Sequence, residues 1–125
     1  MKIGMDHALF VEIGMGADLH GQDPTKASVR AVEDVLHRNS LPGMNELLNG
    51  DMSRMRVEVT LAVPEDADQV DTEAVKARFP YGRISCEVVT GGLAAPSGRL
   101  NAERGDTRDA MYIAIAVIRA GYDDA

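Results

Sequence analysis

Residues 110–118 read AMYIAIAVI and are apolar at all nine positions. Strands that are buried on both faces of a sheet carry continuous apolar runs of this kind, whereas half-exposed strands alternate between apolar and polar residues. We therefore expect this segment to be a central strand of a sheet, or a strand whose second face is covered by another subunit.

Two further strands are predicted upstream of this segment. Residues 55–63 are apolar at every odd position, with polar side chains such as Arg56 and Glu58 between them. Residues 84–90 alternate in the same way, and Cys86 falls on their apolar face, where a structural role is expected. A period of two is typical of strands with one face in the core.

Two helices are predicted between the strands. Asp23-Pro24 is a typical helix start, because an acid caps the first turn and proline occupies the first helical position. Apolar side chains then recur at helical spacing as far as about Asn39. A second helix is expected over residues 71–79, which are followed by a helix-ending proline.

The remaining strand is predicted at residues 9–15, where the odd positions are apolar and Glu12 lies on the opposite face. The order strand-helix-strand-helix-strand-strand predicts a single α+β domain over residues 1–125, with a four-stranded mixed sheet and both helices on one face. The other face would carry a mixed set of side chains: Phe10, Glu12, Arg56, Glu58, Thr60, Ser85, Glu87, Tyr112, Ala114 and Ala116. Because such a face is too apolar to be left in water, we expect a homo-oligomer, with a trimer as the leading hypothesis.

The composition excludes several classes of function. Hydrophobic residues make up 45% of the 125 residues, which is typical of a globular protein. The net charge of −7 disfavours binding to nucleic acid or to an anionic membrane surface. No apolar run approaches the ~18 residues of a membrane span, and no signal peptide is evident. The single cysteine cannot form an intramolecular disulfide, so we expect a soluble cytoplasmic protein.

Residues 14–21 read GMGADLHG and form the candidate functional loop. Gly14, Gly16 and Gly21 would let the backbone approach a ligand and would expose amide groups, as anion-binding loops do. Asp18 and His20 are two residues apart, so in an extended loop they point to the same side. Asp18 would then orient the imidazole as a general base, or the pair would ligate a metal; alternatively, both side chains only hold the turn. The glycine spacing does not fit a dinucleotide fingerprint, so no nicotinamide cofactor is expected.

This GxGxDxHG motif resembles the N-terminal signature of a family of uncharacterised proteins, the Lin locus-tag family of hypothetical proteins. All five fixed positions match, at Gly14, Gly16, Asp18, His20 and Gly21, and the resemblance covers roughly residues 9–119. It implies a fold like that of the trimeric chorismate mutases and the small imine deaminases. The three-domain ring-opening amidohydrolases, cyanuric acid hydrolase and barbiturase, are a more distant analogy. The family brings no established activity with it.

Lys26 and Thr90 complete the candidate catalytic residues. Lys26 lies in the first turn of the first helix, where it would meet an anion or act as an amine, unless it is a solvated surface lysine. In the ring-opening amidohydrolases a serine before paired glycines and a lysine form the reacting dyad, and here Thr90 would take the place of that serine. Gly91 and Gly92 would present free amides to a carbonyl. Alternatively, these residues are only the end of a strand and the turn that follows it.

Arg104 is the last candidate ligand-binding residue. It lies in a long polar stretch, residues 96–109, which contains three arginines. Loops of this length are often functional, so Arg104 would close over a carboxylate or phosphate on a neighbouring subunit. The alternative is that the acids of the same stretch, Glu103, Asp106 and Asp109, pair with its arginines.

The leading functional hypothesis is a small-molecule enzyme with sites at subunit interfaces. The reaction would be acid–base or hydrolytic chemistry, amidohydrolase-like, on a small polar or anionic carbonyl, imine or cyclic amide. The alternative is a non-catalytic ligand-binding or assembly protein whose loop is architectural. No cofactor is expected. Two ligands, Asp18 and His20, are too few for a tight site, so we also expect no bound transition metal.

Overall fold

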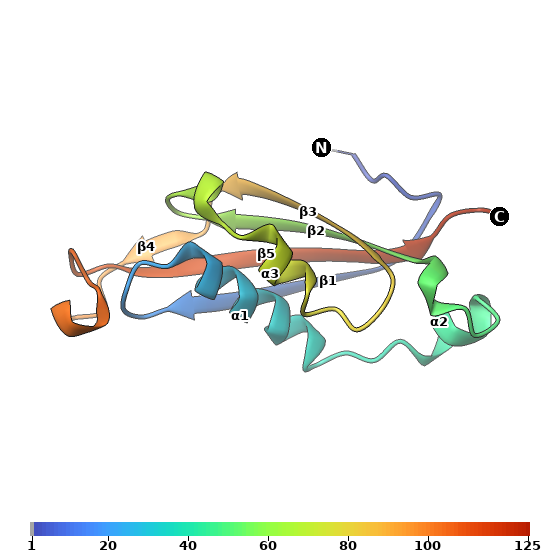
Figure 1. Ribbon diagram of the computed structural model, residues 1–125, viewed down its shortest axis with the longest axis horizontal. Coiled ribbons are helices and arrows are strands. Elements are labelled where there is room, and N and C mark those ends of the chain that lie inside the picture. Colours follow the sequence, from blue (N-terminus) through green and yellow to red (C-terminus); the bar gives the residue numbers. More distant parts are fainter. Residues whose placement is uncertain (1) are drawn as a thin grey trace.

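In the computed structural model, which describes residues 2–125, the strands form one mixed sheet (Figure 1). The strand order is β1 (His7–Asp18), β5 (Met111–Tyr122), β2 (Met55–Val63) and β3 (Arg83–Thr90). β5 runs antiparallel to both of its neighbours, whereas β2 and β3 are parallel. The short strand β4 (Leu93–Ala95) pairs with the first residues of β5 and was not predicted. The α+β fold and the central place of the apolar last strand are therefore confirmed.

Helices α1 (Pro24–Leu36) and α3 (Thr72–Lys76) cover the same face of the sheet, as predicted (Figure 1). The short helix α2 (Pro42–Leu47) lies beyond one end of that face. Both predicted helices are shorter than expected. α3 stops before Phe79 because the amides of residues 78 and 79 bond three residues back, which tightens the chain ahead of Pro80. Single 3-10 turns complete the elements at Met52–Arg54, Ala67–Gln69 and Ala102–Arg104.

The core lies between the sheet and α1. It is built from the odd residues of β2, which the alternating sequence predicts, and from the even residues of β5. Tyr112, Ala114 and Ala116 are fully or almost fully buried there, so their predicted place on the opposite face is wrong. The open face of β5 instead carries the half-buried side chains of Ile113 and Ile115.

Gly14 and Gly16 lie within β1, which continues to Asp18, so the predicted glycine-rich loop at these positions is wrong. A Cβ on Gly14 would lie 2.4 Å from the carbonyl oxygen of Ala31, and one on Gly16 would lie 2.3 Å from the backbone nitrogen of the same residue. Their partners on β5 are also small residues, alanines 116 and 114. These positions have no side chain because α1 packs directly on the backbone of β1.

The apolar odd residues of β1 consequently point away from the helices. Val11, Ile13 and Met15 are 60%, 61% and 62% exposed, which reverses the expected orientation of this strand. Polar side chains of α1 and of the residues directly after it reach over the outer edge of β1. Arg38 Nη2 donates to the carbonyl of Ile13 at 2.8 Å, and the amide of Met15 donates to Asp34 at 3.0 Å. β1 is thus an edge strand with an apolar open face and a partly occupied edge.

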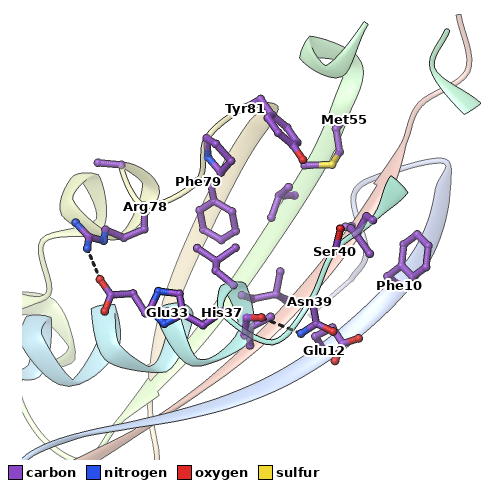
Figure 2. A pocket seen from close by; sticks show the side chains of 18 residues that line it. Phe10, Glu12, Glu33, His37, Asn39, Ser40, Met55, Arg78, Phe79 and Tyr81 are labelled. Atoms are coloured by element: carbon purple, nitrogen blue, oxygen red, sulfur yellow. Dashed lines mark hydrogen bonds and ion pairs between the residues drawn. The ribbon is translucent and has the colours of Figure 1, made fainter. Parts of the chain in front are cut away.

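A cleft of about 500 Å³ opens on the helix-covered side, where both helices have already ended (Figure 2). Its floor is formed by β1, β2 and β5, including Phe10 and Met55, and one wall is the turn that carries Phe79 and Tyr81. This apolar cleft contains none of the candidate residues of the sequence motif.

Candidate functional site

The loop after β1 meets the segment before β5 at the other end of the sheet, and their contacts form the candidate site. The loop turns sharply: Gly21 has φ +107° and Gln22 has φ +48°. α1 then begins as predicted, with the Asp23 side chain accepting from the amides of Thr25 and Lys26 at 2.9 and 3.2 Å. This cap fixes the start of α1 against the loop.

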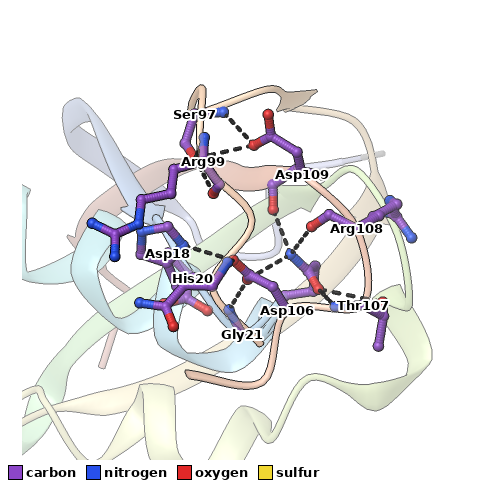
Figure 3. A network of polar contacts seen from close by, with 12 residues as sticks. Asp18, His20, Gly21, Ser97, Arg99, Asp106, Thr107, Arg108 and Asp109 are labelled. Carbon is purple, nitrogen blue, oxygen red and sulfur yellow. Dashed lines mark hydrogen bonds and ion pairs between the residues drawn. The ribbon is translucent and has the colours of Figure 1, made fainter. Parts of the chain in front are cut away.

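Asp106 is the centre of the polar network (Figure 3). One of its oxygens accepts from His20 Nδ1 at 2.7 Å and from the amide of Asn101 at 2.8 Å. The other accepts from the amide of Gly21 at 2.7 Å and from Gln22 Nε2 at 2.9 Å. The backbone amide of Asn101, followed by that of Gly21 and by His20, holds the pKa of Asp106 well below its ordinary value. Asp106 is therefore an ionised, buried carboxylate whose acceptor sites are all used.

Gln22 ties the same two segments together a second time. Its Nε2 also donates to the carbonyl of Ala110 at 2.7 Å, and its Oε1 accepts from the amide of Thr107 at 3.0 Å. The loop after β1 is thus bound to the segment before β5 by backbone and side-chain hydrogen bonds. His20 is held in a fixed orientation by this framework.

Asp18 does not contact His20 through a hydrogen bond, so its predicted role of orienting the imidazole is wrong. It is buried at the end of β1, and its Oδ2 accepts from the amide of Asp23 at 2.9 Å. Its Oδ1 lies 3.4 Å from Arg30 Nη1, and the same nitrogen donates to the carbonyl of Ala17 at 2.6 Å. Asp18 braces the loop and places Arg30, while Asp106 takes the place beside His20.

A small pocket of about 330 Å³ lies in front of His20. Its lining contains three cationic side chains and one carboxylate: Asp18, Leu19, His20, Lys26, Arg30 and Arg104. The predicted candidates Asp18, His20, Lys26 and Arg104 are therefore brought together, although they come from β1, its loop, α1 and the segment before β5. The balance of charge in this pocket is positive and favours an anion.

Thr90, Gly91 and Gly92 do not line this pocket. Thr90 is exposed at the end of β3, which is separated from β1 by two strands. The amide of Gly91 donates to the carbonyl of Val63 at 2.8 Å, and a Cβ on Gly92, which has φ +70°, would lie 2.2 Å from the carbonyl oxygen of Ile113. The paired glycines let the chain pass close to the backbone of β5 on its way into β4, and nothing here brings Thr90 to Lys26.

Sequence reasoning missed Asp106 and Arg30 as parts of the site. Asp106 is 86 positions from His20 and stands among arginines, which favoured the interpretation of a self-paired loop. Arg108 of that loop does form an ion pair, but its partner is Glu65, outside the loop. For Arg30, the only available signal was its place one helical turn after Lys26.

Comparisons with known proteins identify the family of this chain and a solved structure of similar fold. The model of the family "Conserved hypothetical protein (Lin0512_fam)" matches residues 8–120. The chain belongs to this family. Its sequence-based assignment to the Lin locus-tag proteins is thereby confirmed. Among curated proteins, none matches this Lin0512 family member.

Among solved structures, the chain is similar to an FtsZ-like protein of unknown function from Nostoc punctiforme, with a TM-score of 0.84 and 39% sequence identity. The alignment covers 94% of this chain and 97% of the other. The likeness to chorismate mutases and deaminases stays a prediction. Between residues 2 and 125, no helix is both long and apolar enough to cross a membrane. In the same range no three His, Cys, Asp or Glu side chains are grouped so that they could hold a metal ion.

Proposed function

We propose that this Lin0512 family protein is a small-molecule enzyme in which His20 and Asp106 act as an acid–base pair on an anionic substrate. The observation that carries the proposal is the 2.7 Å contact between His20 Nδ1 and the ionised Asp106, at the wall of a cationic pocket. The substrate class is a small polar carbonyl, imine or cyclic amide that bears a carboxylate or phosphate. The reaction class is hydrolysis or proton transfer at a C–N or C=O centre.

The chemistry follows from the hydrogen bond. An ionised carboxylate only accepts, so Nδ1 carries a proton, and in the neutral imidazole Nε2 then holds the lone pair. In residues 2–125, Nε2 has no hydrogen-bond partner, so it remains for a ligand in the pocket that His20 lines. It would take a proton from the substrate or from a water molecule, and the buried Asp106 would stabilise the imidazolium that forms.

The cationic side chains would perform binding and charge stabilisation. Lys26, Arg30 and Arg104 surround the same space from two different segments of the chain. A guanidinium matches a carboxylate or phosphate with two parallel hydrogen bonds, and an ammonium acts as a point charge. One of these groups would hold the anionic end of the substrate, and another would meet the charge that develops on a carbonyl oxygen.

A screen of cyclic amides, imines and small carboxylic acids tests this proposal. His20→Gln should lower turnover at least ~100-fold, as loss of general base catalysis does, without changing the fold. His7→Gln is the matched control, because His7 also lies 2.7 Å from an aspartate but is exposed and far from the pocket. Equal activity in the two variants would remove His20 from the mechanism.

The alternative of a non-catalytic binding protein is favoured by one observation, the saturation of Asp106 by contacts that join two loops. Under that alternative no compound of the screen turns over, yet inorganic phosphate or a dicarboxylate still binds and Arg104→Gln weakens that binding. Binding of phosphate that Arg104→Gln weakens is expected for both functions, so turnover of a screened compound, measured beside a calorimetric titration of both proteins, distinguishes them.

We also propose that the open face of the sheet is buried in a homotrimer. Val11, Ile13 and Met15 form an apolar stripe in which each side chain is at least 60% exposed. Monomeric soluble proteins rarely leave large contiguous apolar surfaces in water. The trimeric state is what the resemblance to trimeric chorismate mutases implies. Light scattering should give three copies for the wild type and for Leu47→Asp, and one copy for Ile13→Asp. Leu47 is a fair control, because it is also exposed but lies on α2.

A further inference from the structure

The larger cleft, at the other end of the sheet from His20, has the construction of a second ligand site. Its volume of about 500 Å³ falls within the ~300–1,000 Å³ of small-molecule pockets. The cleft exists because α1 ends at Leu36 and α3 at Lys76, so neither helix covers the floor between them. Phe79, which a longer helix would have carried on its inner face, stands instead in the wall.

The lining of this cleft includes three aromatic rings among mainly aliphatic side chains. Phe10 comes from β1, and Phe79 and Tyr81 come from the turn before β3, on the opposite side (Figure 2). Tyr81 is 45% and Phe10 36% exposed, so these rings present surface to the cleft rather than being enclosed in the core. Aromatic faces bind apolar groups and also attract cations through their negative π-surface.

The cleft also contains one uncompensated charge. Glu33 and Arg78 neutralise one another by an ion pair across the rim. Asn39 is used in a hydrogen bond to the carbonyl of Val35 at 2.8 Å. Glu12 lies on the floor, on the strand that carries Phe10, and its carboxylate has no hydrogen bond or ion pair with any of residues 2–125. A half-buried carboxylate beside aromatic rings is a site for a positive charge.

We propose that this cleft binds a small amphiphilic amine, with its apolar or aromatic body against Phe79 and Tyr81 and its ammonium group at Glu12. The charge decides the class of ligand. An anion would be repelled by Glu12, and a neutral apolar molecule would leave that carboxylate desolvated without a partner. The chain thus carries two pockets of opposite preference, anionic ligands at His20 and cationic ligands at Glu12. The second site does not depend on the proposed enzymatic function.

The test is a titration of the intact protein with three probes of similar size: 2-phenylethylammonium, 2-phenylethanol and 3-phenylpropionate. Amide chemical shifts in NMR spectra report where each probe binds. We expect saturable shifts at Glu12, Phe79 and Tyr81 with the amine, at least fivefold weaker binding of the alcohol, and no binding of the acid there. Glu12→Gln should weaken amine binding about fivefold and leave alcohol binding unchanged.

Glu87→Gln is the matched control, because Glu87 is exposed on β3 and does not line the cleft, so amine binding should stay at the wild-type value. The proposal is overturned if the alcohol binds as tightly as the amine, or if the shifts occur elsewhere. It is also overturned if the amine does not bind because a second copy fills the cleft in solution. If Glu12→Gln fails to fold, the comparison of amine and alcohol on the wild-type protein still decides the question.

Discussion

Substitution of Gly16 by alanine tests which of two roles the glycines of the motif have. The sequence predicts that they cradle a ligand, whereas the structure shows that Gly16 lets α1 pack closely on β1. The new Cβ would lie 2.3 Å from the nitrogen of Ala31 and 2.5 Å from the carbonyl oxygen of Ala27, whereas ordinary contact begins at 3.4 Å. Both neighbours are backbone atoms of α1, so neither can rotate aside. The helix and β1 must therefore move apart by about 1 Å, and the contact that closes the core is loosened.

Overpacking of this kind costs ~1–3 kcal/mol in the free energy of unfolding, and we expect the upper half of that range because the clash is with backbone. For a domain of this size each kcal/mol lowers the melting temperature by roughly 4 °C, so a loss of about 8–12 °C is expected. Circular dichroism during heating and urea titration measures both quantities. The Kd of Gly16→Ala for inorganic phosphate, measured on the folded protein at low temperature, should equal that of the wild type because Gly16 does not line the His20 pocket.

Gly43→Ala is the matched control. Gly43 lies in the first turn of α2, has no positive φ, and offers open space to an added Cβ, with no atom within 4 Å. Alanine should therefore be neutral there or stabilising by up to ~1 kcal/mol. If Gly16→Ala melts within about 1 °C of the wild type, the close approach of α1 and β1 is refuted. If Gly16→Ala keeps this melting temperature and yet loses phosphate binding, the result supports the role predicted from the sequence, in which Gly16 cradles a ligand.

Three further predictions concern titration, the thiol and metal. The pKa of Asp106 is lowered in the folded protein by the amide of Asn101, so this carboxylate contributes stability above its ordinary pKa of 3.8 that is lost as the pH falls below about 4. Urea midpoints of the wild type and Asp106→Asn should therefore converge between pH 5 and pH 2.5, and a constant gap would contradict this. Burial raises the pKa of Cys86 to about 11, so at pH 8 only about one thiol in a thousand is ionised and labelling by a disulfide reagent should be slow until urea unfolds the chain. Elemental analysis of untagged protein should find no stoichiometric zinc, manganese or iron; metal that is lost in His20→Ala would show the prediction to be wrong.

The order of elements could be predicted because each strand carries its own signal. The nine apolar residues before Arg119 predicted a strand that is central in the sheet or covered on both faces. In the structure, β5 lies between β1 and β2. The orientation of β1 could not be predicted in this way. Its apolar odd positions indicate burial, but Gly14 and Gly16 are the positions under α1, and the alanines at 27 and 31 on the helix were the only sign of that close contact.

The candidate site was predicted in part. His20, Lys26 and Asp18 are near one another in sequence, so a motif could indicate them together. The contact of His20 with Asp106 depends on how the segment before β5 returns to the loop after β1, and no local pattern encodes that path. For Thr90 the prediction came from the analogy with the serine–lysine dyad of the ring-opening amidohydrolases, which would place its hydroxyl near Lys26. In the structure the order of the strands keeps these two residues apart.

The edge of β1 explains why assembly would use the open face rather than extend the sheet. Arg30 and Asp34 of α1, and Arg38 two residues after its end, follow one another at four-residue steps. They bond to the backbone of Ala17, Met15 and Ile13 in turn. Four residues of helix rise about 6 Å, and two residues of strand span about 6.6 Å, so an antiparallel helix and strand stay in register over these three contacts. Three of the backbone groups that a neighbouring strand would need at this edge are therefore already bonded by side chains of the chain itself. Val11, Ile13 and Met15 point at right angles to that edge, and their exposed surface can be removed from water only by a body that packs on the face of the sheet.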